Sequence, residues 1–185
     1  MPPDERTATE LVREGLERAC REFTARIEAL GFRRTKKMLW ARVHLHTADF
    51  IHFHRHGSTY GAPINASVDI RVQLGIRILN DASQRAALGG PSSDPTVVRS
   101  GRYHLRFNAK SGSTYERCID DLVRFVVEQG EPWFQRFVGN TEDLLTVPDS
   151  ELQPSTKELL KAGLSGQPDA NSRAASLKLL GIRKT

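Results

Sequence analysis

The stretch VDIRVQLGIRI, residues 68–78, alternates between apolar and polar side chains at every position. Its apolar members begin at Val68 and end at Ile78, and Leu74 lies near its centre. Because successive side chains of a β-strand point to opposite faces of a sheet, this pattern predicts a long strand with one buried and one polar face. It is the clearest strand signal in the chain, and we expect the rest of the fold to form around it.

Three further strands are predicted. Residues 39–45 and 51–56 both alternate and are separated by a short turn at 47–49, so they predict a β-hairpin. Residues 103–107 alternate again and predict a fourth strand. Residues 80–98 contain the sequence GGPSSDP, which is typical of a long loop.

An amphipathic helix is predicted before the strands, over about residues 8–30. Thr7 and Glu10 have the spacing of a capping box, in which each side chain binds a free backbone N–H at a helix start. Apolar side chains then recur at steps of three and four, which places them on one side of the helix. Gly31 is predicted to end the helix in a left-handed conformation, with Phe32 folded back onto the last turn.

Helices are also predicted after the strands. Residues 114–129 follow a second capping-box spacing at Ser113 and Glu116, and Pro132 is placed to open a short helix. A run of strands flanked by helices indicates the α+β class. We expect a four-stranded antiparallel sheet with helices packed on one face, in a domain of residues 1–140. The remaining residues, 141–185, predict a small C-terminal helical extension of that helical layer.

The composition is that of an ordinary globular protein, since 38% of the 185 residues are hydrophobic and 26% are charged. The apolar runs are too short for a membrane helix, and the first residues lack the features of a signal peptide. Cys20 and Cys118 both fall in helical patterns and suggest reduced thiols. These features predict a cytoplasmic protein without a membrane partner.

The charge is unevenly distributed along the chain. Residues 31–110 contain thirteen Lys and Arg against four Asp and Glu, a net charge of +9, whereas residues 1–30 and 111–185 each carry −2. All six histidines also lie in the basic middle segment. This pattern predicts one electropositive surface, unless the acidic flanking segments pack beside the basic one and neutralise it.

The order of these features resembles a widespread bacterial family known only as a domain of unknown function. The resemblance covers about residues 8–140, where members often have Gln at the position of His54. It implies a cytosolic α+β domain and no established activity, so it assigns no catalytic residue. The motifs that carry it are Gly31-Phe32-Arg33-Arg34, Trp40-x-Arg42, DFIHFH at 49–54, Leu74-Gly75-Ile76 and Pro132-Trp133-Phe134.

The alternation places a basic, histidine-rich set of side chains on the polar face of the predicted sheet. Lys36 and Lys37 are expected near its edge, and Trp40 is the one aromatic residue assigned to it. The predicted binding surface consists of Arg42, His44, His46, His52, His54, Arg71, Arg77, Arg102, His104 and Arg106.

Three functions fit this surface. We expect a non-enzymatic binding module whose partner is an acidic protein or an anionic ligand. A metal-dependent hydrolase is an alternative, because neighbouring imidazoles can bind zinc, copper or nickel, but no carboxylate has the spacing that completes such a site. A nucleic-acid-binding protein is the other alternative, although RNA-binding sheets display several exposed aromatics. No nucleophile motif or phosphate-binding loop is present, so we expect no catalytic residue, cofactor or resident metal.

Overall fold

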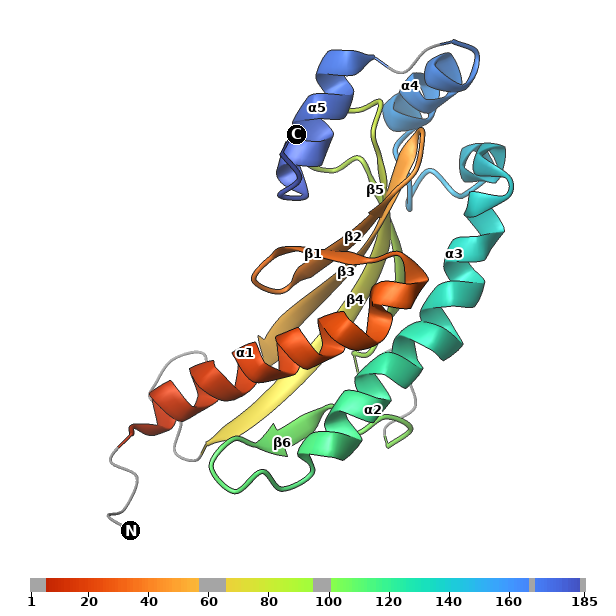
Figure 1. The fold of residues 1–185 in the computed structure, drawn as a ribbon. Helices are drawn as coiled ribbons and strands as arrows, with labels where there is room; N and C mark the ends of the chain where they lie inside the picture. The colour runs from red at the N-terminus through yellow and green to blue at the C-terminus, as the bar shows by residue number, and fades with distance from the viewer. Residues whose placement is uncertain (1–5, 57–65, 95–100, 167–168, 184–185) are drawn as a thin grey trace.

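The computed structural model describes residues 6–56, 66–94, 101–166 and 169–183. In them the chain forms one antiparallel sheet with helices packed against it, which confirms the predicted α+β class (Figure 1). The strands are β1 (Arg33–Lys36), β2 (Leu39–Val43), β3 (Thr47–His56), β4 (Ser67–Ile78), β5 (Ala87–Ser92) and β6 (Arg106–Asn108). The helices are α1 (Ala8–Ile27), α2 (Tyr115–Phe125), α3 (Glu131–Val138), α4 (Pro154–Leu164) and α5 (Ala170–Leu179).

The strand predicted at residues 68–78 is confirmed as β4, the centre of the sheet. Its apolar residues are all buried, and its other side carries the polar ones. The strand order is β1-β2-β3-β4, and both β5 and β6 pair with the remaining edge of β4. β6 pairs with the beginning of β4 at Ser67–Asp69, and β5 pairs with its later residues, from Gln73 to Arg77.

The sheet has six strands in the described residues, so the prediction of four is wrong. β1 was not predicted, and β5 lies within residues 80–98, which were expected to form a loop and of which 95–98 lie outside the described residues. The Gly-Gly-Pro sequence of β5 is compatible with a strand because β5 is at the sheet edge, where a missing N–H costs little. Of the strand predicted at 103–107 only its end joins the sheet, since the His104 amide donates instead to the Asp121 carboxylate at 2.7 Å.

α1 begins and ends as the sequence predicted. The Thr7 hydroxyl accepts a hydrogen bond from the Glu10 amide at 3.2 Å, and the Glu10 carboxylate accepts one from the Thr7 amide at 2.8 Å. After Ile27 a single 3-10 turn continues to Gly31, whose φ of 84° is in the left-handed region that glycine adopts without strain. Phe32 then lies buried against the core.

α2 and α3 form a nearly continuous rod joined by a π-helical turn at Val126–Gly130. The capping box predicted at Ser113 is wrong: Thr114 precedes the helix with φ 63°, and no side chain caps its first turn. Pro132 lies in the first turn of α3, as predicted. None of the described helices combines the length and the apolarity that crossing a membrane would require.

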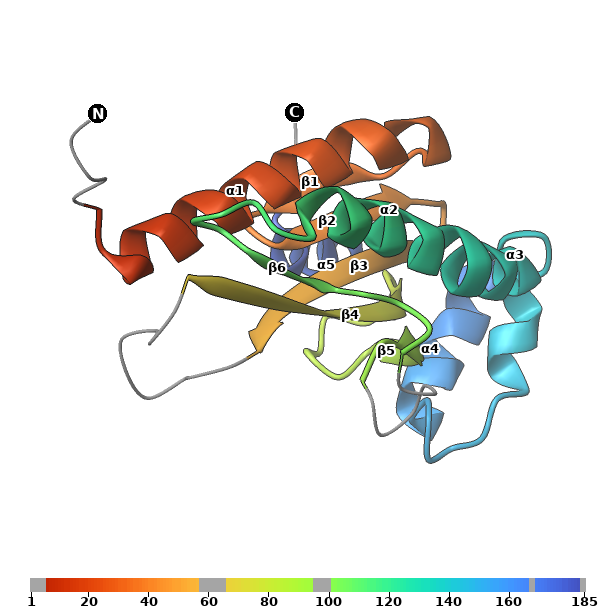
Figure 2. The same ribbon diagram turned by 90° about the horizontal axis from the view of Figure 1, so that it is seen from below.

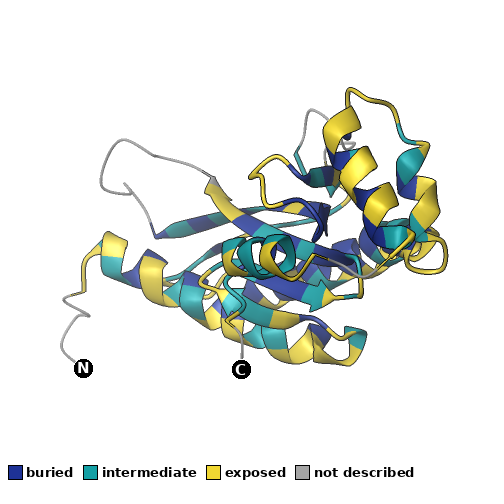
Figure 3. Ribbon diagram, turned by 90° about the horizontal axis from the view of Figure 1, so that it is seen from above, coloured by how far each residue is buried: buried dark blue, intermediate teal, exposed yellow. Residues whose placement is uncertain are grey.

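The main core lies between the sheet and α1, α2 and α3. Figure 3 shows buried residues along the strands and on the inward sides of the helices, while the outward turns are exposed. α4 also contributes Leu160 to this core, and the division of the chain at residue 140 stays a prediction. One cluster in this core joins α1, β4 and α2 and includes Phe23, Val72, Leu74, Ile76, Leu122 and Val126.

α5 lies on the opposite side of the sheet from α1 and α2 (Figure 1, Figure 2). Leu180, directly after α5, packs with Ala41 of β2, Ala48 of β3 and Leu79 in a small second cluster. The prediction that all C-terminal helices extend one helical layer is therefore wrong for α5. The alanines make this possible, because their short side chains leave room for the end of α5 against β2 and β3.

Candidate functional site

The side chains of β2 point the opposite way from the prediction. Trp40 is fully buried on the side of α1, with its ring centroid 5.0 Å from that of Phe23 and its indole N–H donating to the Thr24 hydroxyl at 2.8 Å. Arg42, two residues later, points to the same side. The expectation that Trp40 and Arg42 share the polar face with His52 is thus wrong. Alternation could not decide this, because helices cover both faces of β2.

Arg42 and His44 form part of a partly buried network around the carboxylate of Asp49. The Arg42 guanidinium lies 2.9 Å from the Asp49 carboxylate and 3.1 Å from that of Glu131, and it stacks 4.5 Å above the ring centre of Phe32. His44 Nε2 is 2.8 Å from the same Asp49 oxygen, and the Asp49 side chain is only 1% exposed. The network ties the end of β2 to the start of α3, so the expected place of both residues on an exposed face is wrong.

Three other members of the predicted surface lie outside the strands. His46 is in the turn between β2 and β3, where its carbonyl accepts a hydrogen bond from the Leu79 amide at 2.9 Å. Arg102 and His104 precede β6, and Arg102 pairs with Glu128 of the π-helical turn at 3.0 Å. The expected place of all three on the sheet face is wrong. His46 belongs to a turn, and the segment with Arg102 and His104 follows the edge of α2 instead of extending a strand.

The remaining residues do share one side of the sheet, which we call the open face: the side opposite α1 and α2. His52 and His54 lie on it with ring centroids 4.0 Å apart, and His54 Nε2 is 3.3 Å from the amide oxygen of Gln73. Arg71 also lies there and pairs with Asp94 at 2.9 Å. Arg106 is exposed further along the same face, in β6.

The histidines do not form a shared metal site. His44 and His46 lie away from His52 and His54, because the first pair is near the β2–β3 turn and the second is on the open face. Within the described parts of the chain, no three His, Cys, Asp or Glu side chains come together in a group that could hold a metal ion. The geometry of these residues therefore gives no support to the metal-dependent hydrolase.

Arg77 lies on the open face but is buried beneath α5, with 4% of its surface exposed. Its guanidinium donates to the carbonyl oxygens of Asp81 and Ser83, at 3.3 and 2.6 Å, and to the Ser176 hydroxyl at 3.1 Å. No carboxylate among the described residues lies within 4 Å of it. Burial lowers the pKa of Arg77, an effect that the charge of Asp81 partly counteracts. The groups that directly solvate its positive charge are therefore neutral: two backbone carbonyls and a serine hydroxyl.

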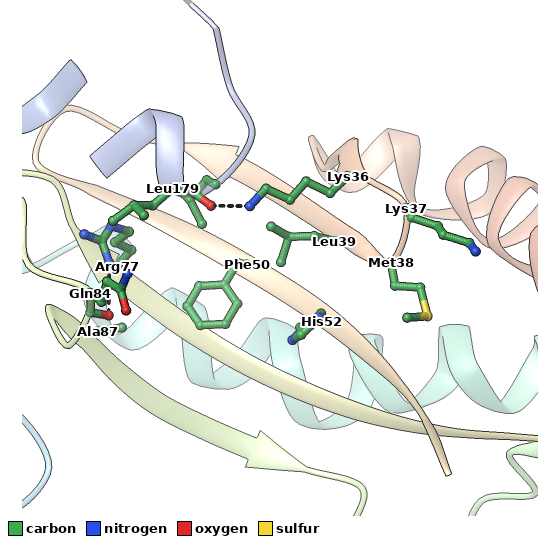
Figure 4. A pocket seen from close by; sticks show the side chains of 11 residues that line it. Lys36, Lys37, Met38, Leu39, Phe50, His52, Arg77, Gln84, Ala87 and Leu179 are labelled. Carbon is green, nitrogen blue, oxygen red and sulfur yellow. Dashed lines mark hydrogen bonds between the residues drawn. The ribbon is translucent and has the colours of Figure 1, made fainter. Parts of the chain in front are cut away.

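A pocket of about 460 Å³ opens between α5 and the open face (Figure 4). Leu39 and Phe50 form its floor, and Leu179 and Leu180 form the wall on the side of α5. Phe50 can lie on the sheet only because its neighbour on β4 is Gly75, where an added Cβ would come 2.2 Å from the Phe50 ring. The glycine at position 75 thus allows a large apolar ring to form the pocket floor.

The ionisable groups around this pocket are basic. They are Lys36, Lys37, His52 and Arg77, and no Asp or Glu of the described residues lines it. The Lys36 ammonium donates to the carbonyl of Leu179 at 2.7 Å and so fastens the α5 wall to β1. Burial, followed by the charges of His54 and Lys36, lowers the pKa of His52 below its ordinary value. An empty pocket therefore favours the neutral imidazole at His52.

Comparison with protein-family models, curated proteins and solved structures finds no match for this chain. The resemblance to a bacterial family of unknown function stays a prediction, and the function must be argued from the site itself.

Sequence reasoning identified the basic residues of the pocket but not its apolar part. Lys36 and Lys37 lie at the sheet edge as expected, and His52 is on the open face. Phe50 was missed, although it follows Asp49 within a segment whose apolar side chains fall on both faces of β3. That excess of apolar side chains was the available signal. The α5 wall had no local signal, because its position depends on tertiary packing.

Proposed function

We propose that this protein is a non-enzymatic binding module that holds an anionic ligand in the pocket between α5 and the open face. The composition of that pocket carries the proposal: an apolar floor, basic groups around it, and no acidic side chain among its described residues. Its volume of about 460 Å³ falls in the range that small-molecule sites occupy. A ligand with one acidic group and an apolar body complements both features.

Electrostatics supports an anion over a neutral ligand. Lys36, Lys37 and Arg77 gather positive charge beside surface that is partly removed from water, where an ionic interaction is stronger than in bulk solvent. Arg77 is the most buried of them, and no described carboxylate compensates it within 4 Å. An anion bound in the pocket would add negative charge to a lining whose described ionisable groups are all basic.

The alternatives have less support. A sheet that binds RNA normally displays exposed aromatic rings for base stacking, yet Trp40 is fully buried and Phe50 lies on the pocket floor. An acidic protein partner could use Arg71 and Arg106, but Arg71 is already paired with Asp94. As part of the same proposal we assign the protein to the cytoplasm, where Cys20 and Cys118, which are buried and not disulfide-bonded, would remain thiols.

A titration with 8-anilinonaphthalene-1-sulfonate, an aromatic anion that fluoresces in apolar surroundings, tests the proposal on the full chain. We expect saturable binding at one site, weakened by added salt and by Lys37→Glu, since exposed charges are screened over about 8–10 Å. Lys110→Glu, which changes a lysine outside the pocket by the same charge, should leave the affinity nearly unchanged. Absence of saturable binding, or an equal loss in both variants, would refute the proposal.

A further inference from the structure

The two ends of the pocket offer different chemistry to a ligand. At the β4 end, the terminal N–H groups of Arg77 donate to carbonyl oxygens and to Ser176, and its Nε–H, which has no partner, is buried. At the β1 end, Lys36 has a single acceptor, the Leu179 carbonyl, and the Lys37 side chain is exposed with no carboxylate of the described residues within 4 Å. Exposed donors that an anion can reach therefore concentrate at the β1 end, at Lys36 and Lys37.

The stretch between the two ends is apolar. Leu39 of β2 and Phe50 of β3 lie side by side below the α5 wall, and Figure 4 shows them between Arg77 on one side and Lys37 and Met38 on the other. This surface offers no hydrogen-bonding side chain to a ligand atom placed over it. It fits a hydrocarbon segment, whose burial is favourable by about 25 cal/mol per Å².

His52 lies where the polar and apolar parts meet. It is opposite Leu39 on β2 and Gln73 on β4, and it neighbours His54 along β3 and Lys36 of β1. Among the described residues, the ionisable groups that face it are Lys36, Lys37 and His54, and none of them is acidic. A carboxylate placed among them would reverse the local balance of charge at this imidazole.

Building on the proposed function, we infer that the ligand is a monocarboxylic acid with an unbranched apolar tail, and that its binding is coupled to protonation of His52. The carboxylate lies between Lys36, Lys37 and His52, and the tail extends over Leu39 and Phe50 along the α5 wall. The ligand enters as the carboxylate, solvent supplies one proton to His52, and the bound state is an imidazolium–carboxylate pair. Proton uptake on binding is the signature of this arrangement.

Calorimetric titration of the full chain with octanoate tests the inference, with 1-octanol as the uncharged probe of equal chain length. Measuring the binding enthalpy at pH 7 in phosphate and in Tris, which differ in ionisation enthalpy, gives the number of protons taken up. We expect octanoate to bind at least about tenfold more tightly than 1-octanol, since a charge-assisted hydrogen bond contributes about 1.5–3 kcal/mol. We also expect net proton uptake, approaching about one proton per octanoate.

Matched variants separate the inference from the proposed function. His52→Gln should abolish the proton uptake, whereas His104→Gln, outside the pocket, should leave it unchanged. Lys37→Gln should weaken octanoate about threefold to fivefold and leave 1-octanol unaffected. If 8-anilinonaphthalene-1-sulfonate binds but octanoate binds no better than 1-octanol, or binds without proton uptake by His52, the inference is overturned and the anion-binding function stands. If neither anion binds, both are overturned.

Discussion

Replacing Leu180 with alanine should loosen α5 from the open face. The Leu180 side chain is 5% exposed and packs on Ala41, Ala48 and Leu79. Burial of a leucine side chain contributes about 1.5–3 kcal/mol, and a rigid cavity left behind raises the cost of its loss toward about 5 kcal/mol. Because α5 lies at the surface and can shift into the space, we expect a cost near the lower end, about 2 kcal/mol.

Hydrogen exchange of the α5 backbone amides measures this loss of stability in the helix itself. A loss of about 2 kcal/mol corresponds to roughly 30-fold faster exchange of the α5 amides if the helix opens as a local unit. The amides of β4 should be unaffected. Leu159→Ala on α4 is the matched control, because that side chain is 45% exposed and its loss should change exchange little. If the α5 amides are unprotected in the wild type, or unchanged in Leu180→Ala, then α5 is not docked and the pocket lacks its wall.

Three further results follow from the core and the pocket. Leu74→Ala should lower the free energy of unfolding by about 2–5 kcal/mol in urea, because the side chain is fully buried at the centre of β4, and a cost below about 1 kcal/mol would contradict that place. Asp49→Ala should cost about 1.5–3 kcal/mol in the same assay, because it removes the nearest carboxylate from the partly buried Arg42, which keeps Glu131 as a partner; a neutral effect would show that Glu131 alone suffices. For His52, the folded pKa lies below the unfolded value of about 6.5, so the unliganded protein should lose stability as pH falls through 6.5 toward the folded pKa. Thermal unfolding of His52→Gln should lack this component, and an identical pH profile in both proteins would contradict the burial of His52.

The success of the β4 prediction and the failure at β2 have one physical cause. Alternation assigns faces correctly when one side of a strand is buried by apolar residues and the other side remains polar, as along residues 68–78. β2 is covered on both sides, by α1 through Trp40 and by α5 through Ala41. Alternation puts Trp40 on the same face as Arg42, and because an arginine is normally exposed, that face was assigned to the polar side of the sheet.

The largely enclosed position of Arg42, whose side chain is 14% exposed, could not be predicted from local sequence. An arginine is expected to be exposed unless a partner compensates its charge. Here the partners are Asp49, on the next strand, and Glu131, at the start of α3. The pairing with Glu131 exists only once the helical layer has packed against the sheet. For the same reason the position of α5, and with it the pocket, could not be predicted from the sequence.

The uneven charge of the chain left two interpretations open, an electropositive surface or internal neutralisation by acidic flanks, and the described residues contain both. Acidic residues from outside the basic segment pair with several of its arginines: Glu17 with Arg34 at 2.7 Å, Glu131 with Arg42 at 3.1 Å and Glu128 with Arg102 at 3.0 Å. The net charge of +9 in residues 31–110 therefore overstates the free positive surface. Three of the basic groups without a described carboxylate within 4 Å, Lys36, Lys37 and Arg77, come together at one pocket. What remains after internal pairing is the part of the charge that a ligand can use, and for that reason the pocket beside α5, rather than the whole basic face, is where binding should be sought.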